Sequence, residues 1–230
     1  MILKTAMTLK TVLFDLDGTL LDTAPDFIIC VNRLRQNQGQ PPLADNVIRA
    51  QVSNGARTMT RLASGLADGD PALEALNCEL LAIYREILGQ HSVLFPGMAD
   101  SLRWIEAQGL RWGIVTNKPS AFTTPLLARL LETGVLPFTP STVVCPDHVS
   151  RSKPDPEPML LACAQSGCQP EEAIYLGDHV RDIEAGRAAN MPTVACEWGY
   201  ISSEEDIARW RADYRLATPD NIPALIRKFI

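Results

Sequence analysis

The chain has 230 residues, of which 46% are hydrophobic and 21% are charged, and its formal net charge is −6. This length predicts one large domain or one domain with a smaller insert, and the apolar content is sufficient for a sizeable core and excludes a disordered chain. The acidic balance disfavours nucleic acids and anionic membrane surfaces as partners, and no apolar run approaches the roughly 18–20 residues that span a bilayer.

We expect no secretory signal peptide at the start of the sequence. Met1–Lys10 holds no apolar h-region and passes directly into a strand-like segment. The six cysteines are scattered without a CxxC pair, and the three histidines are also far apart. This pattern excludes a zinc finger and favours reduced, mostly buried thiols. We therefore expect a cytoplasmic protein.

Short segments rich in apolar and β-branched residues alternate along the chain with segments of helical periodicity. The near-continuous apolar runs are typical of strands that are covered on both faces. Such alternation predicts an α/β fold, with a parallel sheet wrapped by helices. The predicted strands are Thr11–Asp15, Trp112–Asn117, Thr142–Cys145, Ala173–Gly177, Pro192–Cys196 and Tyr214–Ala217. The predicted helices between them are Met98–Gln108, Ser120–Thr133, Pro156–Ser166, Val180–Ala189 and Glu204–Ala212.

The region between the first and second predicted strands has a different pattern. Apolar positions recur there at helical spacing, separated by breaks rich in Gly, Pro and Asp, and no strand pattern is present. We predict a helical insert at residues 23–93, with residues 1–22 and 94–230 forming the sheet domain. Its hinges are expected near Leu21–Thr23 and Phe95–Gly97. The helical stretches are Phe27–Leu34, Val47–Val52, Thr58–Leu66 and Leu73–Leu88.

Polar side chains follow four of the predicted strands, each where the strand ends. In an open parallel sheet these ends lie along one edge, where ligands bind, so the four segments are expected to meet. Taken singly, each residue has an ordinary explanation as a turn residue, a helix cap or a solvated lysine. Their order at consecutive strand ends favours a shared site. The segments are Asp15–Thr19, Thr116–Lys118, Ser152–Pro156 and Gly177–Asp182.

The residue types in these segments suit phosphoryl transfer. Three carboxylates near one point repel each other unless a cation lies among them, and Mg²⁺ takes oxygen ligands and bridges to phosphate. Asp15 and Asp17 can divide the work: one attacks phosphorus, and the other protonates the leaving oxygen and then activates water. Backbone amides after Asp15, the Thr116 hydroxyl and the Asn117 amide can bind phosphoryl oxygens. The sequence therefore predicts a reaction through an aspartyl-phosphate.

Taken together, the four segments resemble the motifs of the haloacid dehalogenase (HAD) superfamily of phosphatases. The matching residues are Asp15-Leu16-Asp17-Gly18-Thr19, Thr116-Asn117, Lys153 and Gly177-Asp178-x-x-x-Asp182, in this order over essentially the whole chain. The resemblance implies a Rossmann-like core with a helical cap inserted after the first strand.

The resemblance also implies a role for each of these residues. Asp15 would be the nucleophile, Asp17 the general acid and base, and Lys153 the charge stabiliser. The phosphate-binding residues would be Thr116, Asn117, Lys153 and Gly18. Mg²⁺ would be held by Asp15, the Asp17 carbonyl oxygen and Asp178, with Asp182 ligating it or orienting a water. His179 is interpreted as a variable residue at the rim, and the presence of Asp17 disfavours dehalogenation.

Within the superfamily, residues 20–23, 116–119 and 152–158 most resemble the phosphoglycolate phosphatase branch. Residues 91–98 and 145–149 are similar to a bacterial subgroup, some of whose members resemble N-acetylmuramic acid 6-phosphate phosphatases. The first prediction is therefore hydrolysis of 2-phosphoglycolate, and the second is hydrolysis of N-acetylmuramic acid 6-phosphate. A β-phosphoglucomutase-like isomerase and a non-catalytic phosphate-binding module are the further alternatives.

Both candidate substrates carry a carboxylate besides the phosphate, so a cap arginine that faces the core would help to bind either. Arg57 and Arg61, one helical turn apart, are the candidates, and a solvated helix face is the alternative for each. The expected partner is a small phosphorylated metabolite, with no nucleic acid and no membrane. The expected assembly is a monomer or a homodimer.

Overall fold

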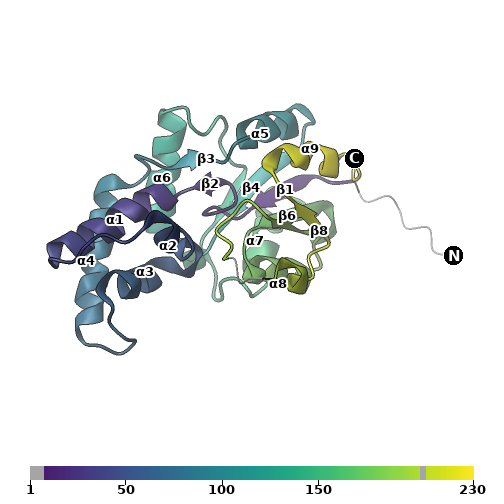
Figure 1. Ribbon diagram of the computed structural model, residues 1–230. Coiled ribbons are helices and arrows are strands. Elements are labelled where there is room, and N and C mark those ends of the chain that lie inside the picture. The colour runs from purple at the N-terminus through teal and green to yellow at the C-terminus, as the bar shows by residue number, and fades with distance from the viewer. Residues whose placement is uncertain (1–7, 203–205) are drawn as a thin grey trace.

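The computed structural model describes residues 8–202 and 206–230 and contains a six-stranded sheet (Figure 1). All the pairings in this sheet are parallel, and the strand order is β5-β4-β1-β6-β7-β8. The six predicted strands are confirmed, with ends that differ by at most two residues. Their bounds are β1 (Thr11–Phe14), β4 (Arg111–Val115), β5 (Thr142–Val144), β6 (Ala173–Gly177), β7 (Thr193–Cys196) and β8 (Tyr214–Leu216).

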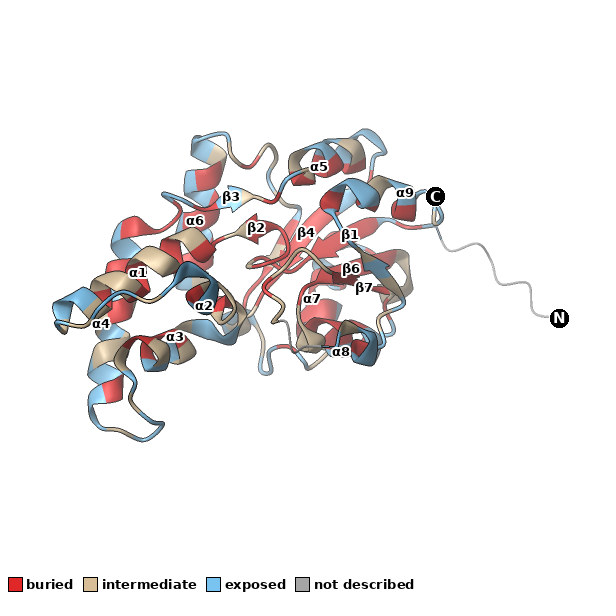
Figure 2. Ribbon diagram, viewed as in Figure 1, coloured by how far each residue is buried: buried red, intermediate tan, exposed pale blue. Residues whose placement is uncertain are grey.

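Helices cover both faces of the sheet, which explains why its central strands are apolar at every position. Val12 and Phe14 of β1 belong to one hydrophobic cluster with helices on one face, whereas Leu13 belongs to a second cluster on the other face. Figure 2 shows the buried residues concentrated in the sheet and on the inner sides of the helices. The helices are α5 (Met98–Ala107), α6 (Ser120–Glu132), α7 (Glu157–Ser166), α8 (Val180–Ala188) and α9 (Ile222–Ile226).

The predicted helix at Glu204–Ala212 is wrong in the part that the structure describes, and Glu204 and Glu205 lie outside the described residues. A short 3₁₀ helix at Ile207–Trp210 stands in its place. The Asp206 side chain caps it by accepting a hydrogen bond from a backbone N–H, and the chain leaves it in a left-handed conformation, with φ of 60° at Arg211. α9 was not predicted from the sequence.

The insert is helical, as the periodicity predicts, and lies beside the carboxyl edge of the sheet (Figure 1). The rings of Phe27 and Tyr84 stack at 4.4 Å between its first and last helices. Two short strands, β2 (Leu21–Asp22) and β3 (Val93–Leu94), pair antiparallel where the hinges were expected, and these strands were not predicted. The insert consists of α1 (Ala24–Asn37), α2 (Asp45–Arg49), a 3₁₀ turn at Val52–Asn54, α3 (Gly55–Ser64) and α4 (Ala72–Ile87).

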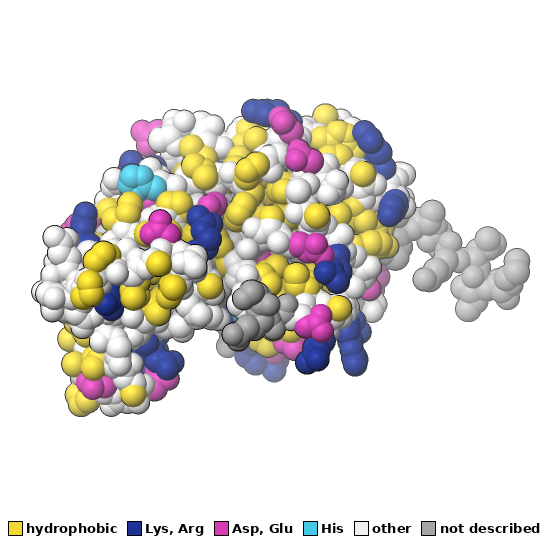
Figure 3. Space-filling model, viewed as in Figure 1, with side chains coloured by type: hydrophobic (Ala, Val, Ile, Leu, Met, Phe, Trp, Pro, Cys, Tyr) yellow, Lys and Arg dark blue, Asp and Glu magenta, His cyan; other side chains and the backbone are white. Residues whose placement is uncertain are grey.

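The distribution of charge on the surface and the burial of the cysteines agree with what the composition predicts. On the face in Figure 3, basic and acidic side chains are interspersed without a continuous basic area. All six cysteines are free thiols, and five of them are buried, with Cys78 exposed. Within residues 8–202 and 206–230, no helix has the length and apolar character needed to cross a membrane.

Candidate active site

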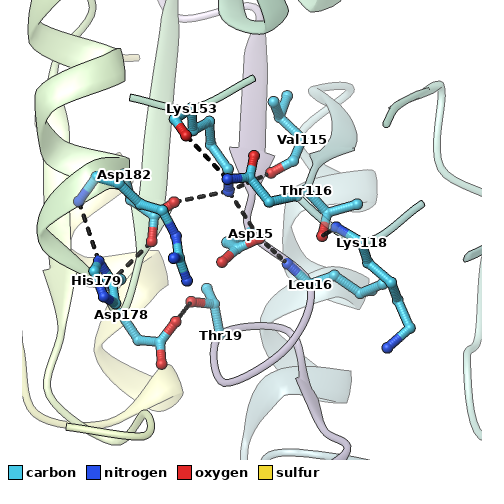
Figure 4. Close-up of polar contacts among 12 residues, drawn as sticks. Asp15, Leu16, Thr19, Val115, Thr116, Lys118, Lys153, Asp178, His179 and Asp182 are labelled. Atoms are coloured by element: carbon cyan, nitrogen blue, oxygen red, sulfur yellow. Dashed lines mark hydrogen bonds and ion pairs between the residues drawn. The ribbon is translucent and has the colours of Figure 1, made fainter. Parts of the chain in front are cut away.

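Lys153 lies at the centre of the carboxyl edge of the sheet, in the loop before α7 (Figure 4). Its Nζ is 2.9 Å from Asp15 Oδ1 and 2.7 Å from Asp182 Oδ1. It also donates to the Val115 carbonyl oxygen at 2.9 Å and to the Tyr175 hydroxyl at 2.8 Å. Burial alone would lower the pKa of Lys153, but the carboxylates of Asp15 and Asp182 more than offset it, and the pKa is raised. Lys153 is therefore a buried, permanently charged cation at neutral pH.

Three carboxylates form a compact cluster beside Lys153. One oxygen each of Asp15, Asp178 and Asp182 lies within 4.8 Å of the others, and all three residues are buried. Burial, followed by the charges of Asp15 and Asp182, raises the pKa of Asp178 to about 8. Burial also raises the pKa of Asp15, and the nearby Lys153 offsets only part of that effect. The cluster therefore carries more negative charge than Lys153 alone can balance.

Close backbone packing holds Asp178 in place. A β-carbon on Gly18 would come within 2.2 Å of Asp178 Oδ2, and one on Gly199 within 2.1 Å of Asp178 Cβ. Gly18 also adopts a φ of +86°, which side chains strongly disfavour. The Thr19 hydroxyl donates to Asp178 Oδ1 at 3.2 Å, and the Tyr200 N–H donates to Oδ2 at 2.9 Å. The glycines thus allow the backbone to surround this carboxylate.

The donor set of this cluster fits a hard divalent cation. Carboxylate oxygens are the ligands that such cations prefer. A bound cation would offset both the burial and the repulsion from Asp15 and Asp182 that raise the pKa of Asp178. Asp182 has both oxygens engaged, since Oδ2 accepts from the His179 N–H at 3.0 Å. His179 Nδ1 accepts from the Arg181 N–H at 3.2 Å, and burial lowers the pKa of His179 to about 4. His179 is therefore a neutral helix cap at pH 7.

Asp17 lies closer to the insert than Asp15 and is more open to solvent. Its Oδ1 accepts from the Thr23 hydroxyl at 2.6 Å and from Lys118 Nζ at 3.0 Å. Its side chain is 17% exposed, compared with 8% for Asp15. The Lys118 Nζ also lies 5.1 Å and 4.9 Å from the ring centroids of Phe27 and Tyr84. Asp17 therefore connects the sheet edge to the hinge and to the first and last helices of the insert.

Three predicted phosphate ligands have further contacts at this edge. Thr116 Oγ1 accepts a backbone hydrogen bond at 3.1 Å, which leaves its own proton free to be donated. The Asn117 amide donates to the Lys153 carbonyl oxygen at 2.9 Å. The Gly18 N–H donates to the Leu21 carbonyl oxygen at 2.9 Å, so this N–H is already paired within the chain. The role of Gly18 in phosphate binding stays a prediction, and its backbone conformation is what the structure describes.

A cavity of about 370 Å³ lies between the sheet edge and the insert. Its polar side contains the predicted residues Asp15, Asp17, Thr116 and Asn117 together with Lys118. Ser53, Asn54, Gly55 and Arg181 also line it. The apolar side is formed by Phe27, Val52, Ala56, Leu81, Tyr84, Pro119 and Phe122.

Arg57 and Arg61 do not line this cavity, so the structure adds no support to their prediction as substrate ligands. Arg57 is 55% exposed and lies 3.7 Å from Asp68 and 3.4 Å from Glu74, and Arg61 is 2.8 Å from Asp68. The physical reason is their helix face, since α3 turns its apolar residues inward and these arginines toward surface acids. Helical spacing could not identify which side of α3 faces the sheet.

Three other residues at the site were assigned no role from the sequence: Lys118, Tyr175 and Arg181. Arg181 lines the cavity and donates to the Ser53 carbonyl oxygen of the insert. Tyr175 lies within β6, and its hydroxyl donates to the Val115 carbonyl oxygen at 2.7 Å. The available signals were the position of Lys118 directly after Asn117 and a tyrosine in a strand that is otherwise apolar. Neither signal indicates where the polar atom points.

Comparisons with known proteins give consistent results. Residues 12–196 match the family model of haloacid dehalogenase-like hydrolases. The chain is 48% identical over 207 residues to an N-acetylmuramic acid 6-phosphate phosphatase of Pseudomonas aeruginosa, covering 90% of each chain. It is 38% identical over 216 residues to a phosphoglycolate phosphatase of Xanthomonas campestris, covering 93% of this chain and 94% of the other.

Solved structures show the same fold. The crystal structure of a predicted phosphoglycolate phosphatase from Haemophilus somnus superposes with a TM-score of 0.80 at 24% identity. The match covers 94% of this chain and 97% of that one. At this identity the likeness describes the α/β architecture and its helical insert, and it carries no information on the substrate.

Proposed function

This chain belongs to the haloacid dehalogenase-like hydrolase family and is a phosphatase, and from that premise we propose that it hydrolyses N-acetylmuramic acid 6-phosphate. The observation that carries this choice is the 48% identity, over 90% of both chains, to a phosphatase of that name. The identity to a phosphoglycolate phosphatase is lower, at 38%. This order reverses the one predicted from the motifs, and 2-phosphoglycolate is the second candidate.

The size of the cavity supports the bulkier substrate. A volume of about 370 Å³ with an apolar side is ample for an acylated sugar acid, whereas a two-carbon acid would leave most of it unfilled. Contacts to the non-reacting part of a substrate can contribute to transition-state binding only if that part reaches them. We propose that residues 23–93 act as the cap that supplies those contacts and limits the access of water.

In the proposed mechanism Asp15 is the nucleophile. Both contacts of its carboxylate, from Lys153 at 2.9 Å and from the Leu16 N–H at 2.7 Å, fall on Oδ1. Oδ2 therefore has no hydrogen bond from the described part of the chain and is available to attack phosphorus. As the new bond between Oδ2 and phosphorus forms, the bond to the leaving oxygen breaks. Thr116 and Asn117 would donate to the phosphoryl oxygens.

Asp17 would act as the general acid in the first half of the reaction and as the general base in the second. It donates a proton to the leaving oxygen and then takes one from a water molecule, which attacks the phosphorus of the aspartyl-phosphate. The bond from phosphorus to Asp15 breaks, and inorganic phosphate leaves. Oδ1 of Asp17 accepts both of its hydrogen bonds, so Oδ2 is the atom free to carry the proton.

We also expect the reaction to take place in the cytoplasm.

Mg²⁺ is the cofactor that we propose for the carboxylate cluster. Asp15 and Asp178 would be side-chain ligands, with the Asp17 carbonyl oxygen, and Asp182 would ligate the ion or orient one of its waters. When bound, the ion would offset the negative charge of the carboxylates and of the phosphoryl group. Lys153 would then have to balance only the negative charge that the ion does not offset.

A kinetic comparison tests this function. Purified protein with Mg²⁺ is given N-acetylmuramic acid 6-phosphate, 2-phosphoglycolate or β-glucose 1-phosphate, and released phosphate is measured. We expect kcat/KM to be highest for the first substrate, by at least about tenfold, and activity to disappear with a chelator and return with Mg²⁺.

Each other outcome identifies an alternative. A higher kcat/KM for 2-phosphoglycolate would replace the proposed substrate with the second candidate. Conversion of β-glucose 1-phosphate to an isomer without phosphate release would indicate a mutase. Absence of turnover on all three substrates would leave a phosphate-binding module.

A further inference from the structure

Lys118 is a buried cation whose function the phosphoryl chemistry does not explain. Its side chain is 6% exposed and lines the cavity. The phosphoryl site already has a cation in Lys153, which contacts Asp15 and Asp182. Figure 4 shows the Lys118 side chain leading away from Asp15, in the direction opposite to the carboxylate cluster. The Lys118 ammonium group is therefore positioned to bind an anion other than the phosphoryl group.

The surroundings of Lys118 satisfy it only in part. Its ammonium group has three N–H bonds, and one is directed at Asp17 Oδ1 at 3.0 Å. The rings of Phe27 and Tyr84 lie 5.1 Å and 4.9 Å from Nζ and favour a cation without accepting hydrogen bonds from it. In residues 8–202 and 206–230 no further acceptor for Nζ is present. Lys118 can thus bind another acceptor in the cavity.

The position of Asp17 indicates which part of a substrate this acceptor belongs to. Under the proposed mechanism Asp17 protonates the leaving oxygen, so the leaving group lies beside Asp17 and on the side of the cavity where Lys118 is. Asp17 uses Oδ2 on the leaving oxygen, so Lys118 keeps its hydrogen bond to Oδ1. The other two N–H bonds of Lys118 then remain available for an anionic group on the leaving alcohol.

The other cations near the cavity are placed differently from Lys118. Arg57 and Arg61 pair with surface acids. Arg181 donates to the Ser53 carbonyl oxygen and has a buried Nε without a partner in the described part of the chain, but its charge acts on Asp15, at the phosphoryl end of the cavity. We propose that Lys118 recognises a carboxylate on the leaving group and thereby selects carboxylated phosphomonoesters. This inference rests on the proposed function as a phosphatase, but it holds for either candidate substrate.

Two matched pairs of substrates test it. N-acetylmuramic acid 6-phosphate is compared with N-acetylglucosamine 6-phosphate, which lacks the lactyl carboxylate. Separately, 2-phosphoglycolate is compared with 2-hydroxyethyl phosphate, in which an alcohol replaces the carboxylate. For the preferred pair we expect the wild type to favour the carboxylated member by about 10–100-fold in kcat/KM, the usual range for a charged hydrogen bond.

Lys118→Met should remove that preference. We expect kcat/KM for the carboxylated member to fall about 10–100-fold further than that for its partner, mainly through KM. Any loss common to both members reports the hydrogen bond from Lys118 to Asp17. Lys118→Arg keeps a positive charge and should retain most of the preference. Arg57→Ala, which removes a surface cation, should leave the ratio unchanged. Circular dichroism and thermal unfolding of each variant identify any loss of fold.

An equal loss on both members of the pair would overturn the inference, because it would mean that Lys118 only supports Asp17. A failure of the proposed substrate is a separate result. In that case the first pair gives poor turnover while the second pair still reports the preference and its loss in Lys118→Met.

Discussion

Two groups of charged residues in this protein differ in what surrounds them. At the sheet edge Lys153 is 0% exposed and contacts two carboxylates, a carbonyl oxygen and a hydroxyl. On α3 of the insert Arg57 is 55% exposed and has acids at 3.4 Å and 3.7 Å. A charge that is removed from water is stable only with several well-placed partners, whereas a solvated charge needs none. The first group should therefore be sensitive to every substitution, and the second should tolerate them.

The largest expected effect is on catalysis at the sheet edge. Asp15→Asn removes the nucleophile, and we expect kcat to fall by at least about 10³-fold. The fold should persist, because Asn can still accept from the Leu16 N–H and Lys153 keeps Asp182. Phosphate release measures the activity, and circular dichroism measures the fold.

The matched control for Asp15→Asn lies in the insert. Asp68→Asn makes the same chemical change at a residue that pairs with Arg57 and Arg61 on the surface. It should retain activity within about twofold. Turnover of Asp15→Asn within tenfold of the wild type would contradict a covalent mechanism through this residue.

The second prediction concerns stability at the same edge. Lys153→Met leaves Asp15 and Asp182 buried without their cation, and the free energy of unfolding should fall by about 3–5 kcal/mol. Urea denaturation without metal measures it. Adding Asp182→Asn to this variant should restore part of the loss, because it removes one of the uncompensated charges. A loss below about 1 kcal/mol would mean that the buried ion pairs contribute little to folding.

The third prediction uses pH to separate the carboxylate cluster from the rest of the molecule. The pKa of Asp178 is raised by burial to about 8, so the folded state holds a proton that the unfolded state has already released above pH 4. Stability without metal therefore falls as pH rises toward 8. The pKa of His179, lowered by burial to about 4, acts in the opposite direction, but only below about pH 6.5.

The window from pH 6.5 to 8 thus excludes His179 and reports the buried carboxylates, Asp178 and also Asp15, whose pKa burial raises as well. The slope from Asp178 is at most about 1.4 kcal/mol per pH unit, which amounts to roughly 2 kcal/mol over the window. Thermal unfolding with a chelator should show this loss, and Mg²⁺ should reverse it by binding the ionised cluster. Asp178→Asn should reduce both the slope and the response to Mg²⁺, and any slope that remains belongs to Asp15. A flat profile for the wild type would place Asp178 in its ionised form without metal.

The same contrast explains what could be predicted from the sequence. Asp15, Lys153, Asp178 and Asp182 follow strands of a parallel sheet, so their convergence is a consequence of topology, and the structure brings them together. The six strands were predicted because full burial requires continuous apolar runs. Contacts made by a particular rotamer or helix face, such as those of Tyr175, leave no comparable pattern.

The sequence was least informative in exposed segments, where helical spacing does not determine the local backbone or the direction of a side chain. The segment at 204–212 has helical spacing but contains a capped 3₁₀ turn in its described part. For Arg57 the spacing on α3 is compatible with either face, and the packing of α3 against α1 and α4 selects one. Lys118 was visible in the sequence beside Asn117, but the aromatic rings around it come from helices more than thirty residues upstream.

The smallest expected effect is on the surface of the insert. Arg57→Ala combined with Arg61→Ala removes the pairs with Asp68 and Glu74, and we expect the free energy of unfolding to change by less than about 1 kcal/mol, because exposed ion pairs contribute little. The kcat/KM for a carboxylated substrate should stay within about twofold, since neither arginine lines the cavity. A selective rise in KM for the carboxylated substrate would contradict this expectation. It would mean that the insert closes further and brings the arginine face of α3 to the substrate, so that the sheet edge and the insert form one binding surface.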